Sequence, residues 1–326
     1  MALIRSFAFA SLRLLVTGGL LWALLTRLDL ARAEEIIGHA SLPWLAAALL
    51  ALFATAPLTA ARWRIILAAA GLSPPFGNLT KLLFVGFFFN QVLPTGVGGD
   101  AVRAWRCKRL GIALAPAIRS VLLDRASGYL VTLAVYAASL PALCHIFSDA
   151  RERLGLLVVF AAGLGGLLVL ALADLLPAKV LRRRPLAALA ELSRESRRLF
   201  AQPKRCAGVL GLSALTVGLS VLAFMLAGKS LGTNLPFATW LMVVPPVTLI
   251  QLLPISFAGW GTRELALVVI LAGFGIAAES ALAVSVVMGL SLIAAGLPGG
   301  LIWLADWDIA RPEAKAAPLP NAERSR

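Results

Sequence analysis

The feature that most constrains the fold is a set of long apolar runs. Residues 154–176 and 207–227 are almost uncharged, and Asp174 is the only ionisable residue in either run. A helix that crosses the hydrocarbon core of a bilayer needs about 20 such residues. Across the chain, 60% of the residues are hydrophobic and 14% are charged, which excludes an ordinary soluble domain. The sequence therefore predicts an all-α polytopic membrane protein.

The apolar runs predict about six membrane-spanning helices. The first could instead be a signal peptide, because Arg5 and Arg13 precede an apolar run and 31–33 (ARA) resembles a cleavage site. We interpret it as a helix, since its removal would leave an internal repeat without its first element. The predicted helices are residues 11–28, 43–61, 116–144, 154–176, 207–228 and 276–304.

Two further apolar segments are interrupted. The first runs over residues 79–92, is broken by the proline and glycines of 94–100, and resumes as 101–110. The second runs over 237–253, is broken by 254–261, and resumes as 262–272. Proline removes a backbone donor and glycine relaxes the helix, so each stop is a true interruption.

Basic residues indicate how the chain lies in the membrane. Residues 179–205 carry nine lysines and arginines against Glu191 and Glu195, which places this loop in the cytoplasm. Counting helices from this loop places both termini in the cytoplasm of a bacterial inner-membrane protein. The same count makes both broken segments re-entrant hairpins. Residues 185–200 resemble an amphipathic helix at the membrane surface.

The formal charge of +14 fits binding to anionic headgroups better than to nucleic acid, because the basic residues flank apolar segments. Cys107, Cys144 and Cys206 are far apart, as are the two histidines, so no metal site or disulfide framework is predicted. No glycine-rich ATP-binding loop of the Walker type is present. We therefore expect no cofactor, and any activity to be passive or ion-coupled.

The two halves of the chain are related. The sequence QVLP at 91–94 matches QLLP at 251–254, and GLSPPF at 71–76 resembles GTNLPF at 232–237. The paired segments lie 160 and 161 residues apart. Together with the charge count, this nearly equal spacing predicts an inverted repeat, an arrangement typical of transporters. We expect one membrane domain over residues 1–310, with repeats at about 1–150 and 151–310, and a disordered cytoplasmic tail at 311–326.

The breaks are the candidate binding site. Irregular backbone is tolerated inside a membrane only where protein or a water-filled cavity surrounds it. Arg103 and Arg263 each lie in the first turn after a break, where the helix N-terminus also favours an anion. Asp100 and Glu264 are expected to pair with these arginines. Alternatively, Asp100 is only a helix cap, and Arg263 and Glu264 are a structural pair that closes a turn.

Other polar residues have two interpretations each. Asp124 and Arg125 form a candidate ion pair inside a predicted helix, or an aspartate with a snorkelling arginine. Asn90 and Gln91 hold a headgroup, cap a helix end, or do both. Arg62 and Arg64 are interpreted as interface anchors rather than ligand contacts. The full candidate set is Asn90, Gln91, Pro94, Gly98, Gly99, Asp100, Arg103, Asp124, Arg125, Gln251, Pro254, Ser256, Gly259, Gly261, Arg263 and Glu264.

Three segments resemble the lysylphosphatidylglycerol synthase transmembrane family, also called flippase-like membrane proteins. They are FFFNQVLPTGVGGDAVR at 87–103, SVLLDR at 120–125 and QLLPISFAGWGTRE at 251–264. In two-part members, the membrane domain moves aminoacylated phosphatidylglycerol between leaflets, and a soluble domain synthesises it. The resemblance implies a stand-alone membrane domain, since the chain ends at Arg326, and it leaves the lipid open.

The leading hypothesis is a lipid flippase rather than an enzyme, with an anionic headgroup held between the two hairpins at Arg103 and Arg263. Its partners would be membrane lipids, with a second copy or a lipid-synthesising enzyme as further candidates. One alternative is an intramembrane lipid transferase that uses Asp100, Asp124 or Glu264 as a base. Another is an anion or small-solute channel with a filter between the hairpins.

Overall fold

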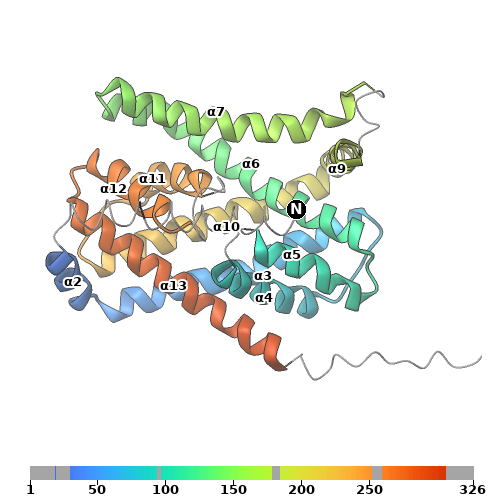
Figure 1. Ribbon diagram of the computed structural model, residues 1–326, viewed down its shortest axis with the longest axis horizontal. Coiled ribbons are helices and arrows are strands. Elements are labelled where there is room, and N and C mark those ends of the chain that lie inside the picture. The colour runs from blue at the N-terminus through green and yellow to red at the C-terminus, as the bar shows by residue number, and fades with distance from the viewer. Residues whose placement is uncertain (1–18, 20–29, 94–96, 178–183, 252–258, 306–326) are drawn as a thin grey trace, which may run out of the picture.

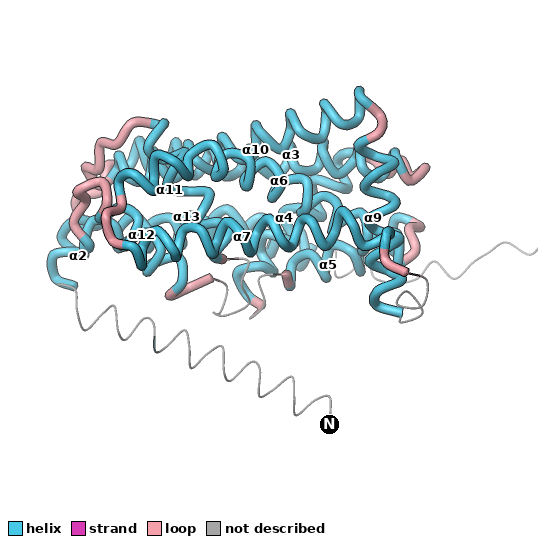
Figure 2. The backbone as a smooth tube through the Cα atoms, turned by 90° about the horizontal axis from the view of Figure 1, so that it is seen from above, coloured by secondary structure: helices cyan, strands magenta, loops and turns pink. Residues whose placement is uncertain are grey.

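The computed structural model describes residue 19 and residues 30–93, 97–177, 184–251 and 259–305. These residues form helices joined by turns, and none of them lies in a strand (Figure 1). Five helices among the described residues are long and apolar enough to cross a membrane. The long helices run obliquely along the longest axis of the molecule (Figures 1 and 2). The five are α3 (Leu42–Ala69), α6 (Leu114–Ile146), α7 with η2 (Ala150–Leu172 and Ala173–Leu175), α10 (Pro203–Ser230) and α13 (Ala278–Ala305).

These five helices confirm five of the six predicted spans, and the sixth, 11–28, lies outside the described residues. The short helix α2 (Leu30–Gly38) precedes α3. The main difference from the predicted helices is at the end of α3, which was predicted at residue 61 and continues to Ala69. Arg62 and Trp63 are buried inside the protein and do not lie at the membrane boundary.

Both interrupted segments are helix–break–helix elements. The first consists of α4 (Phe76–Val92), α5 (Gly98–Arg106) and η1 (Cys107–Leu110). The second consists of α11 (Phe237–Ile250) and α12 (Thr262–Ala272). In each element the two helices pack against one another, so the chain folds back at the break. The central residues of the breaks, 94–96 and 252–258, lie outside the described residues.

Small residues allow the closest helix contacts. A Cβ atom on Gly99 would lie 1.9 Å from the carbonyl oxygen of Gly86, where α5 crosses α4. A Cβ atom on Gly299 of α13 would lie 1.9 Å from the carbonyl oxygen of Phe84 in α4. Glycines at such crossings let two backbones approach closely, which is a main source of helix association in lipid. These contacts fix α4 between α5 and α13.

We expect Gly99→Ala to destabilise the protein by about 1–3 kcal/mol, because the added methyl group must separate α5 from α4. The free energy of unfolding can be measured by titration with sodium dodecyl sulfate in mixed micelles. Gly155→Ala is the matched control, because no atom lies within 4 Å of its added Cβ and the site is also helical. Equal stabilities of the two variants would contradict the close crossing.

The outer helices differ in what they contact. In α7, Leu156 is buried and Val159, Phe160 and Leu167 pack against the core, whereas many of its other apolar residues are exposed, as expected for contact with lipid. The amphipathic helix α9 (Arg184–Phe200) instead places Leu192 and Leu199 in a cluster with residues of α3, α6 and α10. The predicted helix is therefore present, but its apolar face contacts protein. Arg119 of α6 forms ion pairs with two glutamates of α9, Glu191 at 3.0 Å and Glu195 at 2.7 Å.

The helix order repeats along the chain. Adding 161 to both bounds of α3 gives the bounds of α10. Each of these helices is followed by a glycine with positive φ, Gly71 at 77° and Gly232 at 80°. The residue after each glycine donates its N–H to the carbonyl five residues earlier, at 2.9 Å in both cases, which completes the same helix-ending motif. α3 and α10 therefore share bounds and a helix-ending turn at a spacing of 161 residues.

Candidate functional site

The first break is organised by Asn90 and the start of α5. The Asn90 Oδ1 atom accepts the N–H of Gly99 at 2.9 Å, which satisfies one of the unpaired donors in the first turn of α5. This contact joins the two arms of the break. Asp100 follows in the same turn, and Gly98, Gly99 and Asp100 are all buried. Asn90 therefore caps a helix, as one of its two interpretations predicted.

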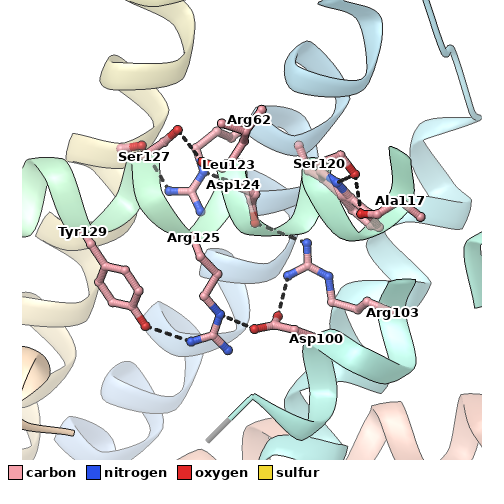
Figure 3. A network of polar contacts seen from close by, with 12 residues as sticks. Arg62, Asp100, Arg103, Ala117, Ser120, Leu123, Asp124, Arg125, Ser127 and Tyr129 are labelled. Carbon is pink, nitrogen blue, oxygen red and sulfur yellow. Dashed lines mark hydrogen bonds and ion pairs between the residues drawn. The ribbon is translucent and has the colours of Figure 1, made fainter. Parts of the chain in front are cut away.

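A network of five charged side chains begins at Asp100 (Figure 3). Asp100 pairs with Arg103 at 3.3 Å and also with Arg125. Asp124 pairs with Arg103 at 3.2 Å and with Arg62 at 2.8 Å. The charges thus alternate through α3, α5 and α6, with Arg103 bridging the two aspartates. Each aspartate is held by two guanidinium groups.

Neutral groups complete this network. Arg125 donates to the Tyr129 hydroxyl at 2.9 Å, and Arg62 donates to Ser213 of α10 at 3.1 Å. The Arg103 guanidinium carbon lies 4.3 Å from the centre of the Trp63 ring, close enough for a cation–π interaction. The network therefore connects four helices from both halves of the chain.

The structure contradicts one of the two interpretations of Asp124 and Arg125, and the interpretation of Arg62. Asp124 and Arg125 do not pair with each other, because successive residues on a helix point in different directions. They use different partners, as Figure 3 shows. Arg62 is not an interface anchor: the residue is 6% exposed, and its side chain pairs with Asp124. Arg64, two residues further along α3, lies on the other side of the helix and is exposed.

The network forms part of the wall of a cavity of about 520 Å³. Pockets of roughly 300–1,000 Å³ are typical of sites for small ligands and headgroups. Residues beside both breaks reach this wall: Gln91, Val97 and Asp100 from the first, and Gln251 and Gly259 from the second. The two breaks therefore meet at one cavity, although they are far apart in the sequence.

The second break is built differently. Glu264 accepts the N–H of Gly261 at 2.5 Å, contacts Arg263 at 2.7 Å, and accepts the Ser285 hydroxyl at 2.8 Å. Arg263 also lies over the Trp260 ring at 4.7 Å. This geometry matches the structural pair that closes a turn. Arg263, Glu264 and Gly261 are absent from the cavity wall, so the structure does not bring Arg263 to Arg103.

The other candidate residues fall into two groups. Asn90, Gln91, Asp100, Arg103, Asp124, Arg125, Gln251 and Gly259 line the cavity, whereas Gly98 and Gly99 pack beside it. Pro94, Pro254 and Ser256 lie outside the described residues. Sequence reasoning missed Tyr129 and a group of hydroxyl side chains in the wall. A signal for them existed, because polar residues in apolar helices usually face the protein interior. The hydroxyl residues are Thr55, Thr59, Thr132, Thr216, Ser220 and Thr248.

The described residues contain no group of three or more histidine, cysteine or acidic side chains placed to hold a metal ion. The cavity chemistry is instead that of hydrogen-bond donors, acceptors and guanidinium groups. Such a wall can bind and orient an anion.

The helices and the charged cavity between them define a polytopic α-helical membrane protein. The sequence model described as the lysylphosphatidylglycerol synthase TM region matches residues 10–299. The protein belongs to this family, a membrane family associated with lipid. No curated protein matches the sequence.

Proposed function

We propose that this protein moves a lipid with an anionic headgroup between the two leaflets of a membrane. The observation that carries the proposal is the shared cavity, in which both helix breaks and five charged side chains meet among apolar helices. Buried charge inside a membrane protein is costly, and it commonly marks a substrate pathway. Family membership supports a lipid as the cargo.

In the proposed mechanism, the headgroup enters the cavity and the acyl chains remain in the hydrocarbon. The breaks act as re-entrant hairpins, and described residues that flank both of them line the cavity. The matching bounds of α3 and α10 and the matching glycine turns support an inverted repeat. Rocking of one repeat against the other would then open the cavity to each leaflet in turn. Transport is passive or coupled to an ion.

The setting of this activity is also proposed. The basic loop at 179–205 supports an inner-membrane protein with both termini in the cytoplasm. The lipid is the main partner. A lipid-synthesising enzyme or a second copy of the chain is a further candidate, because a lipid transporter can receive its substrate from the enzyme that makes it.

We propose transport rather than lipid modification because of the contacts that the two carboxylates in the cavity wall make. Asp100 and Asp124 each contact two arginines. All four carboxylate oxygens contact a guanidinium group, so neither aspartate is placed to contact a substrate hydroxyl as a general base. Both are better placed to position the arginines.

Leaflet exchange in liposomes tests the proposal. The purified full chain is reconstituted with fluorescent phosphatidylglycerol, and a membrane-impermeant reductant bleaches the outer leaflet. We expect bleaching to continue past half of the dye in vesicles that contain protein and to stop there in protein-free vesicles. Identical traces would refute transport. Ion conductance in planar bilayers without lipid exchange would favour the channel alternative.

A further inference from the structure

The charge of the cavity wall limits the headgroup. Among the described residues, the charged members of the wall are three arginines and two aspartates, a net charge of one positive. The central residues of the two breaks, 94–96 and 252–258, contain no ionisable side chain and leave this balance unchanged. A phosphodiester carries one negative charge, so it would neutralise the wall.

Arg103 contributes a buried donor to the charged part of the wall. Arg103 is 5% exposed, and its Nε atom has no hydrogen-bond partner among the described residues. An unpaired buried donor is costly, so a ligand that supplies an acceptor is favoured there. Arg125 is more exposed than Arg103 and lies on the same wall, beside Asp100. These two arginines place the phosphate at the charged end of the cavity.

Elsewhere the wall is polar but uncharged. Hydroxyl side chains come from α3, α6, α10 and α11, and amides come from Gln91 and Gln251. Thr55, Thr132, Thr216, Ser220 and Thr248 donate their hydroxyl hydrogens to carbonyls of their own helices. Each oxygen keeps a lone pair that can accept a hydrogen bond from a ligand. The wall can therefore accept hydrogen bonds from hydroxyl groups of a ligand, and these contacts need no charged residue.

An ammonium headgroup fits less well. It would need a carboxylate, and both aspartates in the described wall are already held by two arginines each. We infer that the cavity selects a phosphodiester lipid with one negative charge and an uncharged polyol or sugar as its terminal group. The inference rests on the proposed function in taking the ligand to be a lipid headgroup.

Binding of soluble headgroups to the detergent-solubilised full chain tests this inference apart from transport. The probes are glycerophosphoglycerol, glycerophosphomethanol, glycerophosphoethanolamine and inorganic phosphate, measured by calorimetry. We expect glycerophosphoglycerol to bind about tenfold more tightly than glycerophosphomethanol, which has the same charge but lacks the terminal hydroxyls. Glycerophosphoethanolamine should bind more weakly than either.

A variant links this preference to the wall. Thr216→Val combined with Ser220→Ala removes two hydroxyls on one face of α10. It should reduce the preference for glycerophosphoglycerol and leave the affinity for glycerophosphomethanol unchanged. Thr80→Val is the matched control, because Thr80 also donates to a carbonyl of its own helix but lies outside the cavity wall. Retained binding of glycerophosphomethanol shows that the variant is folded.

Several results would overturn the inference. They are equal affinity for the glycerol and methanol esters, tighter binding of the ethanolamine ester, equally tight binding of inorganic phosphate, or no binding at all. Failure of the proposed function is a different result: the headgroups bind in the expected order, yet no lipid crosses the liposome membrane.

Discussion

Asp124→Asn is expected to lower the free energy of unfolding by about 3–5 kcal/mol, the largest effect that we anticipate from a single substitution. Asp124 is 1% exposed and balances Arg62 with one carboxylate oxygen and Arg103 with the other. Asparagine keeps the shape but supplies one acceptor and no charge. It leaves the buried Arg62 guanidinium without a counter-ion and leaves Arg103 with Asp100 alone. Titration with sodium dodecyl sulfate, followed by tryptophan fluorescence, measures the loss.

The same substitution at Asp149 is the control. Asp149 caps α7 and accepts the N–H of Arg151 at 2.9 Å at an exposed site. Asparagine is an equally good N-cap, so stability should hardly change. Arg62→Gln added to Asp124→Asn removes one unbalanced guanidinium, so the double variant should be more stable than the sum of the single effects predicts. An Asp124→Asn protein as stable as the Asp149→Asn protein would contradict the network.

The helices were largely predictable from the sequence because lipid imposes a simple rule. Each span must bury its own backbone hydrogen bonds and present apolar side chains over a fixed length. The bounds of α12, Thr262–Ala272, equal the predicted ones, since Gly261 and Gly273 limit the helix on both sides. The end of α3 was missed because charge was taken to mark the membrane boundary, whereas Arg62 finds its counter-ion inside the protein.

Which polar residues meet was less predictable, because partners are set by helix packing. The pattern around the breaks correctly brought Gln91, Asp100 and Gln251 to one cavity. The same pattern placed Arg263 beside Arg103 by analogy between the halves. Glu264 and Ser285 hold Arg263 elsewhere, and no local signal distinguishes it from Arg103. Likewise, the leucines of α9 indicate an apolar face but do not say whether lipid or protein covers it.

Arg103 lines the cavity and Arg263 does not. The second large expected effect follows from this difference. Arg103→Gln should slow leaflet exchange of phosphatidylglycerol by about tenfold or more, because a charge-assisted hydrogen bond contributes ~1.5–3 kcal/mol. Arg103 lies in the cavity wall and carries the unpartnered Nε donor. Arg103→Lys should have an intermediate rate, since it keeps the charge but loses the planar donor set. Rates are compared per folded molecule in the liposome assay.

The matched control is Arg263→Gln combined with Glu264→Gln. Replacing both members of this buried pair leaves no unbalanced charge, which is better tolerated than removing one partner. Because neither residue lines the cavity, the exchange rate should stay close to that of the unmodified protein. If the double variant lost exchange while Arg103→Gln kept it, the headgroup would be held at the second break. The cavity beside Arg103 would then have to be assigned another role.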